Sequence, residues 1–151
     1  MARTESAIRT ETFYPYPPAR VWRALTDPVA LAAWLMPNDF QPVLGHRFTF
    51  RTEPVPPYFD GVVHCEVLEL DSPRTLAYSW RGMAGMDTVV RWELTGTTRD
   101  GVAGTLLVGV HSGFDLTDPA QLGGFRSMSG GWGGAMVSAL DTVLATIERE
   151  E

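Results

Sequence analysis

The feature that most constrains the fold is one long amphipathic helix at the end of the chain. From about Ser127 to Arg149 the sequence predicts a helix, because large apolar residues recur there at steps of three and four: Trp132, Met136, Leu140, Leu144 and Ile147. Residues 47–112 instead alternate with period two, which is typical of half-buried strands joined by turns. A sheet with one apolar face needs a cover, and only the last predicted helix is long enough to provide it.

The N-terminal part predicts one strand followed by two short helices. Alternation over Ile8–Tyr14 indicates the strand. Pro18 suits the first position of a helix, because proline has no amide proton to leave unpaired. Asp27 followed by Pro28 predicts a second helix start with a carboxylate cap, and Pro37 ends that helix.

The middle of the chain predicts the remaining strands. They centre on Phe48 and Phe50, Gly61–Leu70, Leu76–Trp80, Val90–Leu94 and Gly104–Ser112. Tyr78 and Trp80 share one strand face, opposite Ala77, Ser79 and Arg81, and Asp100-Gly101 is a strong turn signal. Short turns pair consecutive strands antiparallel, so we expect an α+β domain over residues 1–151 with an antiparallel sheet of about six to seven strands.

Composition excludes several classes of function. The chain has 151 residues, a formal net charge of −6 and scattered basic residues that are all arginine. Without a basic stripe, binding to nucleic acid or to an anionic membrane surface is disfavoured. The absence of lysine excludes Schiff-base chemistry and the lysine of a phosphate-binding loop. We expect no nucleic-acid partner, no membrane partner and no cofactor.

Cys65 is the only cysteine, so no internal disulfide can form, as is typical of a reducing compartment. The N-terminus lacks the apolar core of a signal peptide, and no run of apolar residues is long enough to span a bilayer. These features predict a cytoplasmic location.

A set of residues spread over nearly the whole chain matches a known pattern: Val21-Trp22, Asp27-Pro28, Trp34, Gly45, Phe48, Gly61-Val62, Pro73, Trp80, His111-Ser112-Gly113-Phe114 and Gly131-Trp132. On these residues the chain resembles the START-like (SRPBCC) superfamily, also called the birch-pollen-allergen type or helix-grip fold. Within it, the chain is similar to the family homologous to the activator of the heat-shock-protein-90 ATPase. The resemblance implies a sheet curved around the C-terminal helix, with a cavity between them.

Two residues depart from the family pattern. His46 stands where the family usually has a second glycine, which changes a turn. Gly109 stands inside the last strand where the pattern favours an apolar side chain, and a strand glycine leaves space for a bulge or a pocket. We expect Gly109→Leu to fill that space without overpacking the core.

Candidate catalytic and metal-binding motifs have plainer explanations. Ser129 lacks the glycine that a nucleophile elbow places two residues before the serine, so helix capping explains it better. In His64-Cys65-Glu66 only the outer two residues share a strand face, and a catalytic zinc wants three protein ligands. We assign no catalytic residue and no metal ligand, and we expect Cys65 to fill the core.

We predict instead a cavity lined by eight residues: Phe50, Tyr78, Trp80, Trp92, Gly109, His111, Trp132 and Met136. Rings at this density suit a slot for a flat or branched apolar ligand, although the same rings could simply fill the core. His111 has two readings as well. It either acts as a general base or hydrogen-bonds the turn that follows it and caps the end of the sheet.

Three functions remain open. The leading one is a non-enzymatic module that binds a small apolar molecule. The second is an enzyme of the cyclase or hydrolase kind, for which His111 with Tyr78 or Glu93 is the candidate polar pair. The third is a protein that interacts with a chaperone, as the family resemblance implies. We also expect a homodimer over a monomer, because the many aromatics and the proline-rich loop Pro54–Pro57 could expose an apolar patch.

Overall fold

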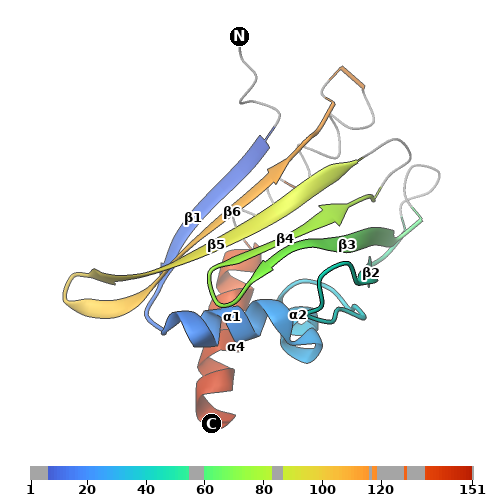
Figure 1. The fold of residues 1–151 in the computed structure, drawn as a ribbon. Coiled ribbons are helices and arrows are strands. Elements are labelled where there is room, and N and C mark those ends of the chain that lie inside the picture. The colour runs from blue at the N-terminus through green and yellow to red at the C-terminus, as the bar shows by residue number, and fades with distance from the viewer. Residues whose placement is uncertain are drawn as a thin grey trace.

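The computed structural model describes residues 7–54, 60–82, 87–115, 117–118, 128 and 135–150, with only the backbone of residues 135 and 147–150. The described strands form one antiparallel sheet in the order β1-β6-β5-β4-β3-β2 (Figure 1). The strands are β1 (Ala7–Tyr14), β2 (Arg47–Arg51), β3 (Val62–Asp71), β4 (Thr75–Trp80), β5 (Thr88–Arg99) and β6 (Val102–Ser112). The described helices are α1 (Pro18–Thr26), α2 (Pro28–Trp34) and α4 (Ala135–Glu150).

The two short helices begin where their prolines and cap predict. Pro18 and Pro28 are the first residues of α1 and α2. A side-chain oxygen of Asp27 accepts a hydrogen bond of 3.0 Å from the backbone amide of Val29, which satisfies one of the unpaired donors at the start of α2. The sequence prediction for both helices is confirmed.

Among the described helices, α1 and α2 join α4 in covering the inner face of the sheet, which we define as the face turned toward the helices. Leu25 of α1, Leu31 of α2 and Leu144 of α4 are each at most 1% exposed. α4 packs across both α1 and α2, and Figure 1 shows it passing behind them and behind one end of the sheet. The expectation that only the C-terminal helix covers the sheet was therefore incomplete, because α1 and α2 share that task.

The stripe on the C-terminal helix is confirmed where the structure describes it. Leu140 and Leu144 are buried, and Met136 is half-buried against the core. Trp132 and the predicted helix start at Ser127 lie outside the described residues, as does the side chain of Ile147.

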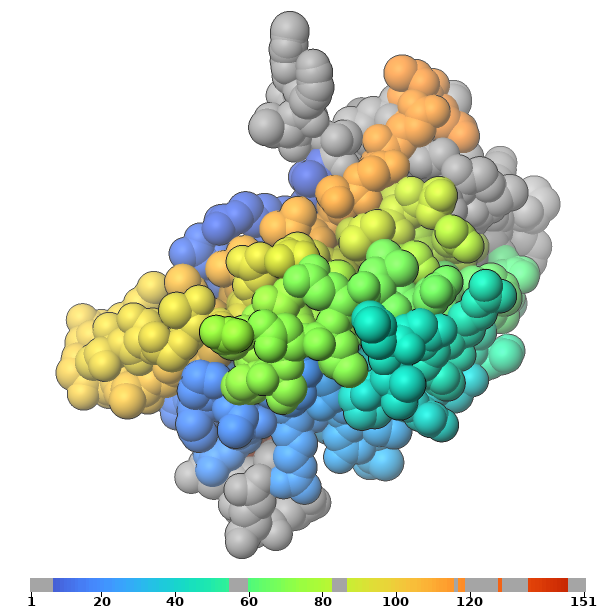
Figure 2. Space-filling model, in the orientation of Figure 1, coloured from blue at the N-terminus to red at the C-terminus, as the bar shows by residue number. Residues whose placement is uncertain are grey.

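The β5–β6 hairpin closes as the Asp100-Gly101 signal predicts. Both turn residues have positive φ, 53° for Asp100 and 80° for Gly101, as a tight two-residue hairpin turn requires. The pairing runs from Val89 opposite Ser112 to Arg99 opposite Val102. The far end of this hairpin projects beyond the rest of the sheet, as Figure 2 shows from the outer side.

The outer face of β4 is buried, although alternation alone predicts an exposed face. Ala77 and Ser79 are only 5% and 6% exposed. Ala77 pairs with Glu69 on one side and Arg91 on the other, and those two side chains form an ion pair across it. A small residue on a central strand is thus covered by its longer neighbours. No helix within the described ranges combines the length and apolar character needed to cross a membrane.

Candidate functional site

Strand β1 supplies a row of hydroxyl groups to the inner face. Alternation turns Thr10 and Thr12 toward the helices, while Arg9 and Glu11 point outward and form an exposed ion pair of 2.8 Å. Tyr14 ends the same inner row and is 3% exposed. β1 is an edge strand that pairs with β6 along its whole length, so this row lies directly beside the inner residues of β6.

Two small cavities adjoin this row. The first, of about 10 Å³, is lined by Ile8, Thr10, Val90, Trp92, Gly109, Val110 and His111. The second, of about 20 Å³, lies between the sheet, α2 and α4 and is lined by Thr10, Thr12, Tyr14, Trp34, Trp92, Leu107, Met136, Val137 and Leu140. Thr10 and Trp92 line both. Each cavity has room for about one water molecule.

Gly109 makes room for the ring of Trp92. The two residues are directly opposite on β6 and β5, and a Cβ atom on Gly109 would lie 2.5 Å from Cζ3 of Trp92. The pairing around Gly109 is continuous, so no bulge occurs there. The expectation that Gly109→Leu fills empty space is therefore wrong, because the indole already occupies the position next to the glycine.

A row of aromatic rings continues across the inner face of β2, β4 and β6. Phe50 contacts Trp80 with ring centroids 5.3 Å apart, and Trp80 contacts His111 at 5.3 Å. Tyr78 packs against Phe48 at 5.4 Å and against Phe50 at 6.0 Å. These separations are typical of packed aromatic pairs. The rings of Phe50, Tyr78 and Trp80 therefore pack against other aromatic rings. These three residues line neither of the two cavities.

The indole N–H groups at the cavities are engaged within the protein. Nε1 of Trp92 donates a hydrogen bond of 3.0 Å to the hydroxyl of Tyr78. Nε1 of Trp34 donates one of 2.9 Å to the carbonyl of Ala24, and its ring meets Trp92 edge-on at 5.9 Å. Both tryptophans therefore present ring surface to the second cavity.

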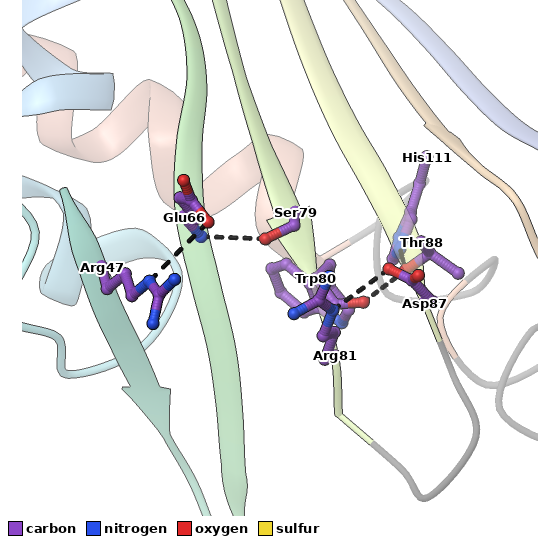
Figure 3. A network of polar contacts seen from close by, with 8 residues as sticks. All are labelled: Arg47, Glu66, Ser79, Trp80, Arg81, Asp87, Thr88 and His111. Carbon is purple, nitrogen blue, oxygen red and sulfur yellow. Dashed lines mark hydrogen bonds and ion pairs between the residues drawn. The ribbon is translucent and has the colours of Figure 1, made fainter. Parts of the chain in front are cut away.

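His111 belongs to a buried hydrogen-bonded chain at the end of the sheet (Figure 3). The hydroxyl of Thr88 donates to the carbonyl of Trp80 at 2.6 Å, and Nε2 of His111 lies 2.8 Å from the same hydroxyl oxygen. Because Thr88 has one proton and gives it to the carbonyl, we assign Nε2 as the donor. Burial lowers the pKa of His111 to about 3, so the ring is neutral near pH 7.

Tyr14 links β1 to α4. Its hydroxyl donates a long hydrogen bond of 3.3 Å to the carbonyl of Val137. Burial, and next the negative charge of exposed Asp141, raise the pKa of Tyr14 to about 12. Tyr14 is therefore neutral at physiological pH.

Of the two polar pairs expected for an enzyme, the pair of His111 with Glu93 is not assembled. Glu93 points to the outer face, where it accepts a hydrogen bond of 2.8 Å from Arg91, so it cannot act together with His111 on the inner face. With a pKa of about 3, His111 is a weak base near neutrality. Among the described residues, no three His, Cys, Asp or Glu side chains converge as metal ligands.

The predicted site residues separate into three groups. Trp92, Gly109 and His111 line the first cavity, and Trp92 and Met136 line the second. Phe50, Tyr78 and Trp80 lie in the aromatic row, and Trp132 lies outside the described residues. Sequence reasoning missed the hydroxyl row of β1. The signal was present, because Thr10 and Thr12 alternate with the charged residues of that strand.

An open antiparallel sheet with two short helices after the first strand and a long helix at the end is the arrangement that the sequence resemblance implies. A family model described as "Activator of Hsp90 ATPase homolog 1-like protein" matches residues 15–145. The chain belongs to this family.

Solved structures agree with membership of the Activator of Hsp90 ATPase homolog 1-like family. MLL2253 from Mesorhizobium loti is 32% identical, with a TM-score of 0.77 over 93% of this chain and 97% of that one. NE0264 from Nitrosomonas europaea is 18% identical, with a TM-score of 0.76 over 96% and 97%. DynU16, a protein in the dynemicin biosynthetic locus, is 24% identical, with a TM-score of 0.71 over 93% of this chain and 48% of that one. A comparison with curated proteins gives no match.

Proposed function

We propose that this protein is a binding module for a small, largely apolar molecule held between the inner face of the sheet and α4. The observation that carries the proposal is the pair of adjoining cavities along β1, both lined by Trp92 and Thr10 and the second also by Trp34 and Thr12. Ligand sites are commonly lined by apolar and aromatic side chains with a few polar groups that fix orientation. DynU16, which shares this fold, comes from a biosynthetic locus.

Binding requires the gap to widen. The described cavities hold about one water each, whereas ligand pockets are usually of the order of 300–1,000 Å³. Tyr14 holds α4 to β1 through one hydrogen bond at the long end of the range. We therefore propose that α4 moves away from β1 when a ligand enters, and that Tyr14 sits at the place where the two elements separate.

The proposal is tested by titrating the protein with Nile red, a neutral dye whose emission changes in apolar surroundings. We expect saturable binding to the wild-type protein, and about tenfold weaker binding to Val137→Phe, which fills the second cavity. Val29→Phe is the matched control, because it adds the same ring on a helix where Val29 is 79% exposed. Absence of saturable binding, or equal binding to both variants, would contradict the proposal.

Two other functions predict different outcomes in parallel assays. A chaperone partner predicts stimulation of the Hsp90 ATPase by a chain that binds no apolar probe. An enzyme predicts conversion of the bound molecule, which native mass spectrometry of protein purified without denaturation would detect as a changed ligand mass. A retained ligand of constant mass supports the binding module and identifies the molecule.

A further inference from the structure

The charge and hydrogen-bonding state of the cavity walls restrict the kind of molecule that fits, provided that the gap between sheet and α4 is a ligand site. None of the described residues that line either cavity is aspartate, glutamate, lysine or arginine. The two titratable lining residues are neutral near pH 7, because the pKa of His111 is about 3 and that of Tyr14 is about 12. Asp141 on α4 is exposed, and its negative charge acts on Tyr14 from outside the cavity.

A charged ligand would therefore lose its hydration without gaining a partner charge. Transfer of an unpaired carboxylate or ammonium into such surroundings is strongly unfavourable. The field of Asp141 adds repulsion for anions in particular. The charged residues of the sheet near this region point to the outer face, where Arg9 pairs with Glu11 and Arg91 pairs with Glu93.

Most of the polar side chains of the walls are already engaged by other residues. Trp92 donates to Tyr78, Trp34 donates to Ala24, and Tyr14 donates to Val137. His111 is bonded to Thr88. By contrast, the hydroxyl of Thr10 makes no hydrogen bond to any described residue, and it lines both cavities beside the face of Trp92.

We infer that the site selects uncharged aromatic molecules that carry one oxygen function, and that the hydroxyl of Thr10 is the group that binds this oxygen. A hydroxyl can donate to a carbonyl or an ether and can accept from an alcohol or a phenol, so the inference names a chemical class and no single compound. The ring system of the ligand lies against Trp92, which the second cavity places opposite α4.

The test uses four naphthalene compounds of nearly equal size in competition with bound Nile red: naphthalene, 2-naphthol, 2-naphthoate and 2-naphthylmethylammonium. We expect 2-naphthol to compete best, naphthalene to be about 3- to 10-fold weaker, and both ions to be weaker still. Thr10→Val should weaken 2-naphthol by about 3- to 10-fold and leave naphthalene unchanged, because it removes one hydroxyl and little volume.

Two controls separate a binding role from a structural one. Thr12→Val removes a hydroxyl from the same strand face, but Thr12 lines only the second cavity whereas Thr10 lines both, so the preference for 2-naphthol should remain. Thr10→Ser keeps the hydroxyl and should restore the preference. Equal competition by the two ions, no competition by any of the four compounds, or an unchanged preference in Thr10→Val would overturn the inference. Failure of Nile red itself to bind the wild-type protein would instead overturn the proposed function.

Discussion

At the scale of single residues, the absence of a side chain at Gly109 makes room for the ring of Trp92. A Cβ atom there would lie 2.5 Å from Cζ3 and 2.9 Å from Cε3 of Trp92, and such contacts force either the ring or the backbone to shift. The ring of Trp92 is held in turn by Tyr78 and Trp34, so it has little freedom to yield. Glycine at 109 is therefore tied to the orientation of one tryptophan.

Gly109→Ala should lower the free energy of unfolding by about 1–3 kcal/mol through overpacking. Gly96→Ala on β5 is the matched control, because its new Cβ would lie 3.5 Å from Cγ of Pro18, an ordinary contact. We expect the control to be neutral or slightly stabilising. Urea denaturation of both variants checks this, and equal stability of the two would contradict the packing role.

His111 makes stability depend on pH. In the unfolded chain a histidine binds a proton below pH about 6.5. In the folded protein His111 stays neutral down to about pH 3. Between these values the unfolded state binds more protons, so stability should fall as the pH falls, by up to about 1.4 kcal/mol per pH unit. Above this window both states are neutral and His111 contributes no pH dependence.

The contribution of His111 is isolated by a comparison with His111→Gln. The carboxylates titrate in both proteins, so their effect cancels in the difference. We expect the wild-type protein to lose more stability than the variant between pH 6.5 and pH 4.5 in urea denaturation. Parallel curves for the two proteins would show that the ring is not held neutral by burial.

At the scale of elements, the contact between β1 and α4 is the one that we propose opens when a ligand binds. β1 is held by its full pairing with β6, whereas α4 is held by side-chain packing on α1 and α2 and by the bond from Tyr14 to Val137. Moving β1 would break the backbone hydrogen bonds that pair it with β6, whereas moving α4 breaks only side-chain contacts. α4 is therefore the element that can move without breaking the sheet.

Tyr14→Phe should accelerate amide hydrogen exchange in α4 while leaving β5 unchanged. The loss of one hydrogen bond should reduce the free energy of unfolding by about 0.5–1.5 kcal/mol. Tyr16→Phe is the control, because the Tyr16 hydroxyl makes no hydrogen bond to a described residue while its ring keeps the contact with Arg20, 5.4 Å from the ring centroid. In the wild-type protein we expect α4 to exchange as slowly as β5. Exchange at the rate of a free tail would contradict its role as the cover of the sheet.

At the scale of the whole molecule, the described aromatics do not form the exposed patch that motivated a dimer. Phe48, Phe50, Tyr78, Trp80 and Trp92 are all at most 4% exposed. The large apolar residues that are exposed among the described ones are Val29, Val43, Leu44, Leu68 and Val102. Residues 55–57 of the proline-rich loop lie outside the described part of the chain.

The homodimer remains a prediction with a direct measurement. Light scattering across a range of concentrations should give twice the chain mass of 16.6 kDa if the dimer forms. A value equal to the chain mass at every concentration would remove the prediction. Leu44→Ser serves as a probe of the exposed apolar residues before β2, because Leu44 is 64% exposed and its replacement should affect association and leave the core intact.

The sequence alone determined the elements, because the signals for them are local. Pro18 and Pro28 start helices through a property of one residue, Asp100-Gly101 turns the chain through its own backbone angles, and period-two alternation orients each strand. Only the tertiary structure decided the surroundings of particular side chains. The space beside Gly109 is occupied by the ring of Trp92, and Ala77 is covered by the ion pair of Glu69 and Arg91. The side chain of Glu93 points away from His111. These outcomes depend on which strands become neighbours and in what register, and contacts between residues far apart in sequence leave no local pattern to read.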